Sequence, residues 1–184
     1  MNRRHVVALA LAAALLGAGP ALAQQSDPQN TLVLTTKDGK VTIRLRPDLA
    51  PKHVEQIKTL VKRNFYDGIV FHRVIEGFMA QTGDPTGTGT GGSDLPNLPA
   101  EFSREPFKRG TLGMARSNSP NSANSQFFIC FGDASFLNGQ YTVFGEVVSG
   151  MDVVDKIKKG DPNANGLVKN PDKIVSLRLL ADAK

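Results

Sequence analysis

The sequence contains no tryptophan, two tyrosines, three histidines and a single cysteine among its 184 residues. One cysteine cannot form an internal disulfide, so the domain must be stable by packing alone. That residue, Cys130, lies in an apolar run, and we interpret it as a buried core residue rather than a reactive thiol. His5, His53 and His72 lie far apart with no pair of cysteines near them. We therefore predict no metal site.

The usual signatures of hydrolases and of nucleic-acid-binding proteins are also missing. No G-x-S-x-G nucleophile motif occurs, and the acidic residues are scattered along the chain. The formal net charge is +5, but no run of five or more basic residues occurs. We therefore predict no nucleic-acid partner. A hydrophobic fraction of 40% and a charged fraction of 21% are typical of one globular domain.

Residues 87–92, GTGTGG, match the pattern G-x-G-x-x-G. The dinucleotide fingerprint needs a strand before this pattern and a helix after it. No strand pattern directly precedes it here, and Pro96 and Pro99 follow too soon for a helix. A nucleotide-binding oxidoreductase is therefore the least supported of the possible functions. We interpret residues 83–100 as a long loop that flanks a substrate site.

Residues 1–23 have the pattern of a secretory signal peptide. Two arginines supply an N-terminal positive charge, residues 6–16 are an unbroken apolar run, and residues 21–23, Ala-Leu-Ala, match a cleavage site. A retained membrane anchor is the alternative, but the run is short for the roughly 20 residues that span a bilayer. We expect cleavage after Ala23, no stable membrane insertion of the mature chain, and a polar lead-in over residues 24–30.

Residues 31–182 are predicted to form one mainly β domain. Two β-type runs, 31–36 and 41–45, are joined by Asp-Gly, which is a strong hairpin signal. Pro51 opens an amphipathic helix, since a proline at the first helical position loses no hydrogen bond. Further short strands are expected over residues 70–74, 78–82, 111–116, 126–131, 141–148 and 173–180, with a second helix over residues 151–159. The absence of β-α-β alternation indicates an antiparallel sheet or barrel.

Residues 71–84, FHRVIEGFMAQTGD, resemble the signature of the cyclophilin-type peptidyl-prolyl cis-trans isomerases. The similarity continues in the same order at residues 113–116, 124–129, 136–139 and 143–145. It covers roughly residues 31–180, nearly the whole predicted mature chain. The resemblance implies a closed eight-stranded antiparallel β-barrel capped by two α-helices. It also implies prolyl isomerase activity and no cofactor.

The resemblance also implies a set of site residues. Arg73 corresponds to the catalytic arginine of the family, and we group Phe78 and Gln81 with it as catalytic, Gln81 because it is placed to orient Arg73. Without the resemblance, Arg73 would be interpreted as an ordinary solvated strand residue. The positions that correspond to substrate-binding residues are His72, Met79, Ala115, Arg116, Gln126, Phe128, Phe136, Leu137 and Tyr141.

The expected partners are proline-containing peptides and unfolded client proteins. Phe136 stands where the members best known for binding cyclosporin have tryptophan, and Tyr141 stands where many members have histidine. We therefore expect weak cyclosporin binding. An export signal and a chain without disulfides or retention motifs favour the bacterial periplasm, and a eukaryotic secretory compartment remains an alternative. A peptide-binding chaperone or scaffold that uses the same groove is the competing function.

Overall fold

The computed structural model describes residues 27–183 and contains, near their start, the hairpin that the sequence predicts. Strand β1 (Thr31–Thr36) pairs antiparallel with β2 (Gly39–Leu45), with Thr36 opposite Gly39. Gly39 has a φ of +142°, a conformation that glycine adopts without the steric cost of a side chain. The predicted signal peptide, residues 1–23, lies outside the described residues.

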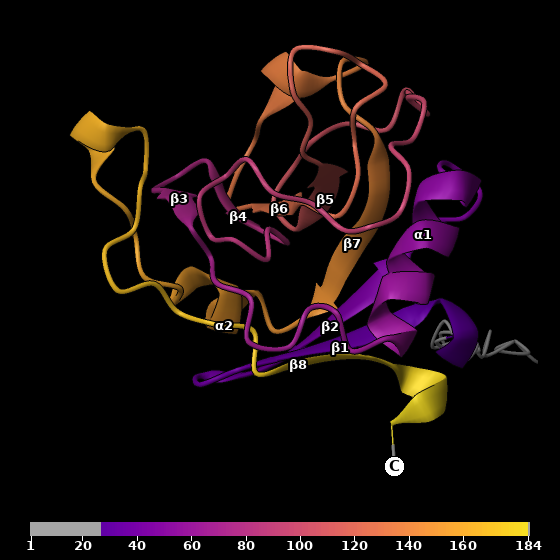
Figure 1. The fold of residues 1–184 in the computed structure, drawn as a ribbon, viewed down its shortest axis with the longest axis horizontal. Coiled ribbons are helices and arrows are strands. Elements are labelled where there is room, and N and C mark those ends of the chain that lie inside the picture. Colours follow the sequence, from indigo (N-terminus) through magenta and orange to yellow (C-terminus); the bar gives the residue numbers. More distant parts are fainter. Residues whose placement is uncertain (1–26, 184) are drawn as a thin grey trace, which may run out of the picture.

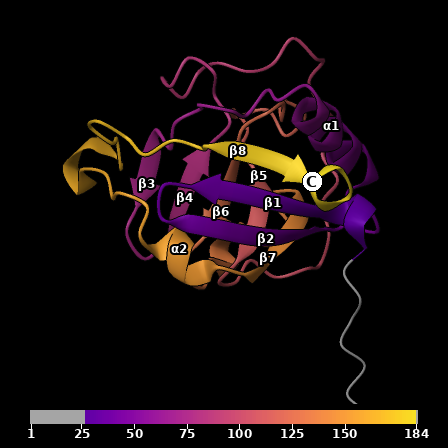
Figure 2. The same cartoon turned by 90° about the horizontal axis from the view of Figure 1, so that it is seen from below.

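Eight strands form one antiparallel sheet in the order β3-β4-β6-β5-β7-β2-β1-β8. Figure 2 shows the last four strands of this order, β7, β2, β1 and β8, side by side. The remaining strands are β3 (Arg73–Ile75), β4 (Met79–Thr82), β5 (Thr111–Met114), β6 (Phe127–Cys130), β7 (Val143–Ser149) and β8 (Ser176–Leu179). Each predicted strand therefore exists, although most are shorter than predicted.

The sheet is an open half-barrel, so the prediction of a closed barrel is not supported. Strands β3 and β8 are the two ends of the sheet, and no strand ladder joins them within the described residues. The segments that precede them, residues 68–71 and 172–174, are joined by one isolated bridge, Val70 to Lys173, and by three backbone hydrogen bonds. Asn170 has a φ of +51°, and Pro171 has no N–H to donate. These two residues interrupt any regular ladder at that point.

Helix α1 (Pro51–Lys62) confirms the predicted first helix and packs against β7 and β8. Its N-terminus has no cap from a neighbouring side chain. Instead, the carboxylate of Glu101 accepts the backbone N–H groups of Lys52 and His53, at 3.2 and 3.1 Å, and contacts His53 Nδ1 at 2.6 Å. The loop that follows β4 therefore satisfies helix N–H groups that would otherwise lack a partner.

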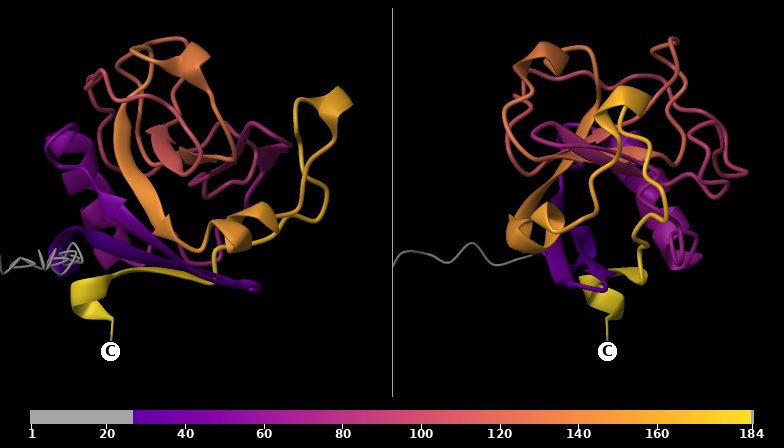
Figure 3. Two further views of the ribbon diagram at one scale, coloured as in Figure 1. Left: turned by 180° about the vertical axis from the view of Figure 1, so that it is seen from behind. Right: turned by 90° about the vertical axis from the view of Figure 1, so that its left-hand side faces the viewer.

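Helix α2 (Met151–Asp155) packs against β2 and is shorter than the predicted helix over residues 151–159. The N–H of Lys158 donates to the carboxylate of Asp172 at 2.9 Å, and the N–H of Gly160 donates to the carbonyl of Val74, also at 2.9 Å. Tertiary partners thus replace the helical ones. Figures 1 and 3 show α1 and α2 well apart from each other, and both contribute side chains to the same apolar cluster.

The apolar interior is divided into two clusters. The larger one lies between the helices and the curved sheet, and a smaller one contains Met79, Phe107, Phe128, Cys130, Ala134, Leu137 and Val143. Cys130 is fully buried, which confirms the prediction of a core residue, and burial raises the pKa of its thiol to about 12. Within residues 27–183, no helix is long and apolar enough to cross a bilayer.

Candidate active site

A groove of about 410 Å³ lies over the smaller apolar cluster. Strands β3, β4 and β6 supply part of it, and the loops after β5 and before β7 supply the rest. It is lined by Arg73, Phe78, Met79, Gln81, Ala115, Arg116, Phe128, Phe136, Leu137, Gln140 and Tyr141. Nearly all residues that the resemblance predicts for the site are therefore brought together by the fold.

The walls of the groove are largely aromatic. Phe128 is buried and meets Tyr141 edge to face, with ring centroids 6.0 Å apart. Phe78 packs against Phe136 at 5.2 Å, and Phe136 is 63% exposed at the rim. The guanidinium of Arg116 lies 4.4 Å from the centre of the Tyr141 ring, a cation–π distance. Such a surface suits an apolar ring that carries few polar groups.

Arg73 lies at one end of the groove because of strand register. In the β3–β4 pair, Arg73 is directly opposite Gln81, so their side chains are neighbours on one face of the sheet. Arg73 Nη1 donates to Gln81 Oε1 at 3.1 Å. Gln81 Nε2 donates to Gln126 Oε1 at 2.9 Å, and Gln126 Nε2 donates to the carbonyls of Gly89 and Gly91. This directional chain specifies the orientation of both amides.

The partners of the Arg73 guanidinium are neutral. No carboxylate forms an ion pair with Arg73 within residues 27–183. Burial lowers the pKa of Arg73. Arginine nevertheless remains protonated at neutral pH because its ordinary pKa is above 12. The groove therefore holds a cation whose charge is not neutralised by a fixed anion.

Two residues at the site are absent from the set that the sequence predicts: Gln140, which lines the groove, and Asn165, which contacts Arg73. The backbone carbonyl of Asn165 accepts from Arg73 Nε at 3.0 Å, and its Oδ1 accepts from Arg73 Nη2 at 2.9 Å. Asn165 and Arg73 are 92 positions apart in the chain. The Asn165-Gly166 pair is a turn signal, but no local pattern relates that turn to Arg73.

Two predicted substrate-binding residues do not line the groove. His72 is buried, and neither ring nitrogen has a hydrogen-bond partner among the described residues. Burial lowers its pKa, and its ring faces the loop at Gly89 rather than the groove. The physical reason is strand alternation, since His72 and Arg73 are adjacent and point to opposite faces. Gln126 lines a neighbouring depression of about 550 Å³.

Asp84 organises the glycine-rich loop beside the groove. Its Oδ1 accepts from the N–H and the hydroxyl of Thr86 at 2.8 and 2.7 Å. Its Oδ2 accepts from the N–H groups of Gly89 and Gly91 at 2.6 and 3.1 Å. A Cβ at Gly91 would collide with this carboxylate. The glycine pattern at residues 87–92 therefore serves close packing around Asp84.

Acid is expected to weaken the fold through Asp84. Burial alone would raise its pKa, but hydrogen bonds from Thr86, Gly91 and Gly89 lower it to about 2, from 3.8. The stabilisation is therefore complete above about pH 4 and is lost as the pH falls toward about 2. Asp84→Asn should lower the free energy of unfolding at pH 7 by about 2 kcal/mol.

Urea unfolding at a series of pH values measures this effect. The difference in unfolding free energy between the parent and Asp84→Asn should shrink as the pH falls from about 4 to about 2. Asp94→Asn is the matched control, because Asp94 lies in the same loop and is 79% exposed in its ion pair with Arg63. A pH-independent difference between the parent and Asp84→Asn would contradict the prediction.

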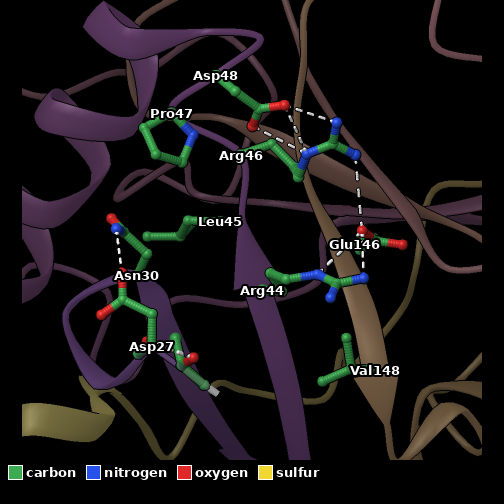
Figure 4. A pocket seen from close by; sticks show the side chains of 10 residues that line it. Asp27, Asn30, Arg44, Leu45, Arg46, Pro47, Asp48, Glu146 and Val148 are labelled. Atoms are coloured by element: carbon green, nitrogen blue, oxygen red, sulfur yellow. Dashed lines mark hydrogen bonds and ion pairs between the residues drawn. The ribbon is translucent and has the colours of Figure 1, made fainter. Parts of the chain in front are cut away.

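A larger depression of about 820 Å³ lies elsewhere, over β2 and β7. Figure 4 shows that its two arginines already pair with carboxylates. Arg44 donates to Glu146 at 2.9 Å, and Arg46 donates to Asp48 at 2.7 Å. The lining of this depression contains no aromatic side chain, unlike the groove at Arg73, so that groove is the candidate active site.

The structure is an antiparallel half-barrel with an aromatic groove. Two guanidinium donors, Arg73 and Arg116, line this groove without an ion pair to a carboxylate of the described residues. These features define a class of protein whose site can bind an apolar ring without a covalent nucleophile. Comparison with known proteins specifies the class. Residues 31–179 match the family model described as "Cyclophilin type peptidyl-prolyl cis-trans isomerase/CLD". The chain belongs to this family, and its activity is peptidyl-prolyl cis-trans isomerisation.

Relatives in several organisms support this assignment. The chain is 60% identical over 193 residues to a protein of Brucella suis biovar 1 named "Probable peptidyl-prolyl cis-trans isomerase", an alignment that covers 99% of this chain and 98% of that one. It is 44% identical over 132 residues to the peptidyl-prolyl cis-trans isomerase of Helicobacter pylori strain J99, with 70% of this chain and 80% of that one covered.

Solved cyclophilin structures share the fold. A cyclophilin from Hirschia baltica superposes with a TM-score of 0.76 at 29% identity, covering 86% of this chain and 76% of that one. A cyclophilin-type isomerase of Cryptosporidium parvum, crystallised in the presence of the dipeptide Ala-Pro, superposes with a TM-score of 0.74 at 28% identity. That comparison covers 81% of this chain and 98% of the other.

Proposed function

We propose that this isomerase catalyses rotation about X-Pro bonds in exported proteins as they fold, in the bacterial periplasm. The pattern of residues 1–23 supports export, because a positive N-terminus, an apolar run and a small-residue cleavage motif occur in the required order. The similarity to a bacterial protein over 99% of the chain supports a bacterial setting. Unfolded exported chains expose X-Pro bonds in both isomers, so they are suitable clients.

The reaction to be accelerated is a rotation, and no bond to the protein is needed. The peptide C–N bond resists rotation because the nitrogen lone pair is delocalised into the carbonyl, with a barrier of about 18–20 kcal/mol. In the twisted state the lone pair returns to the prolyl nitrogen, which then accepts a hydrogen bond. A catalyst must therefore stabilise the twisted amide more than the planar one.

The observation that carries the proposal is the unneutralised Arg73 guanidinium at the end of the aromatic groove. An N–H of Arg73 donates to the prolyl nitrogen in the twisted state, where a lone pair is available, and hardly at all in the planar state. A charge-assisted hydrogen bond of about 1.5–3 kcal/mol accounts for roughly one to two decades of rate.

The rest of the acceleration is assigned to the aromatic walls. We propose that Met79, Phe128 and Leu137 bind the proline ring, while backbone groups near Ala115 hold the chain on one side of the bond. An apolar surface also favours the twisted amide, whose charge separation is smaller than that of the planar form. No group in this proposal transfers a proton. The expectation of weak cyclosporin binding, based on Phe136 and Tyr141, stays a prediction.

Expression of the full chain in a Gram-negative bacterium tests the export part of the proposal. The protein should appear in the periplasmic fraction, and N-terminal sequencing should begin at Gln24. Ala23→Asp is expected to abolish processing at that position, because the cleavage site requires a small residue there. Recovery of the parent in the cytoplasm with Met1 at its N-terminus would overturn the assignment. Rotation of a short X-Pro peptide, followed by NMR exchange, tests the catalytic part.

A further inference from the structure

The open edge of the half-barrel at β3 is covered by residues 160–168. The N–H of Val74 donates to the carbonyl of Gly166 at 2.8 Å, and the N–H of Gly160 donates to the carbonyl of Val74 at 2.9 Å. An isolated bridge also joins Arg73 to Leu167. Figure 1 shows this segment beside β3. Covering an edge strand satisfies its exposed backbone groups, and here it also brings a new residue to the active site.

Asn165 and Gly166 form the part of this segment that faces Arg73. Their φ angles are +53° and +77°, so both residues have the left-handed backbone conformation. A Cβ at Gly166 would lie 2.5 Å from the side chain of Ile75 and 3.0 Å from the carbonyl oxygen of Val74. The turn is therefore packed tightly against β3. Because of this packing, the backbone at Asn165 is held beside Arg73, although the Asn165 side chain itself is exposed.

The hydrogen bonds of the Arg73 guanidinium show what Asn165 does. A guanidinium has five N–H donors in a rigid fork. Nε and one N–H of Nη2 donate to Asn165, and one N–H of Nη1 donates to Gln81. The remaining two donors have no oxygen or nitrogen partner within the described residues. Nη1 also makes a long contact of 4.0 Å with the sulfur of Met79, which lines the groove.

We propose that Asn165 is a positioning residue for the isomerase reaction, holding the Arg73 fork so that its two remaining N–H groups are available to the prolyl nitrogen. This inference rests on the role proposed for Arg73. Gln81 alone would leave the fork free to rotate about one hydrogen bond, whereas Asn165 binds two of its nitrogens from the opposite side. Asn165 is neutral, so it restricts the guanidinium without forming an ion pair that would compete with the substrate.

Asn165→Gly is the most selective test. Glycine adopts a φ of +53° readily and keeps the backbone carbonyl that accepts from Nε, so only the Oδ1 acceptor is lost. The expected result is a kcat lowered roughly 3- to 10-fold, with KM changed by less than about twofold, measured by NMR exchange on a short X-Pro peptide.

Asn170→Gly is the matched control. Asn170 is also left-handed, with a φ of +51°, is exposed, and makes no side-chain hydrogen bond to the described residues. The kcat of the Asn170→Gly variant should equal that of the parent. Asn165→Asp retains an acceptor for Nη2 but would form the ion pair that the neutral amide avoids, so its kcat should also fall below that of the parent.

A double variant separates positioning from general stabilisation. In an Arg73→Ala background, Asn165→Gly should have no further effect on kcat, because the residue that Asn165 positions is absent. An additional loss of the same size in that background would overturn the inference, as would an unchanged kcat in Asn165→Gly alone. If Arg73→Ala itself leaves kcat unchanged, the proposed catalytic role of Arg73 is wrong. Failure of that role can therefore be distinguished from failure of the positioning role of Asn165.

Discussion

Replacement of Arg73 by alanine is expected to slow rotation of a model X-Pro peptide by more than about tenfold. The variant removes the donor that meets the prolyl nitrogen in the twisted state, while the aromatic walls that bind the ring remain. The loss should therefore appear mainly in kcat, since the planar ground state gains little from the donor. NMR exchange over a range of peptide concentrations separates kcat from KM.

The fold of Arg73→Ala should survive. Arg73 is only partly buried at the edge of the sheet, and its neutral partners Gln81 and Asn165 can bond to water once it is gone. Arg63→Ala is the matched control, because Arg63 lies on the surface in an exposed ion pair with Asp94 and should leave kcat unchanged. A kcat for Arg73→Ala within about twofold of the parent would exclude the proposed mechanism.

The same variant distinguishes an isomerase from a chaperone. The aromatic groove and the exposed Phe136 offer a surface that unfolded chains can bind even when rotation is slow. Protection of an aggregating client can be followed by light scattering with Arg73→Ala in place of the parent. If protection decreases together with kcat, the protein acts on its clients by isomerisation. Undiminished protection would favour peptide binding as the main function.

Phe127→Ala should produce a larger loss of stability than any of the other substitutions, with about 3–5 kcal/mol removed from the free energy of unfolding. Phe127 is 2% exposed and lies in the larger apolar cluster. Its ring contacts Tyr66 and Phe144 edge to face, with centroids 5.6 and 5.9 Å away. Removal of the ring leaves a cavity that this close-packed cluster cannot fill. Urea unfolding monitored by circular dichroism measures the loss.

Phe128→Ala is the informative comparison, because Phe127 and Phe128 are neighbours on β6 that point to opposite faces. Phe128 belongs to the smaller cluster, stacks on Phe107 at 5.8 Å and lines the groove. Phe128→Ala should lower kcat/KM at least about tenfold in the folded protein, whereas Phe127→Ala should leave it nearly unchanged below its unfolding temperature. Equal catalytic losses in the two variants would show that this division between core and groove is wrong.

Local elements were predictable because short-range chemistry determines them. The Asp-Gly pair between two alternating runs produced the β1–β2 hairpin, and Pro51 marks the first residue of α1. The burial of Cys130 followed from the apolar run around it. Each of these features depends on interactions among residues that are close in the chain.

Elements whose ends depend on distant partners were predicted less well. The second helix ends early because two N–H groups donate outside the helix. Lys158 donates to the carboxylate of Asp172, and Gly160 donates to the carbonyl of Val74. The sheet stays open because the segments before β3 and β8 are joined by an isolated bridge and a few backbone hydrogen bonds rather than by a strand ladder. A hydrophobic pattern indicates only which faces are buried. It therefore shows neither the distant hydrogen-bond partners of the second helix nor the absence of a ladder between the ends of the sheet.

The sequence by itself determined the hairpin, the first helix and the mainly β class, and its ordered motifs predicted the site residues around Arg73 through resemblance to a family. Only the tertiary structure decided which of them share the groove. Register between β3 and β4 brings Gln81 to Arg73, alternation along the chain turns His72 away, and a turn 92 residues beyond Arg73 brings Asn165 to its other side. Contacts between residues so far apart in the chain depend on how the whole sheet curves and on which segment covers its edge. Local sequence patterns predict neither the curvature nor the covering segment.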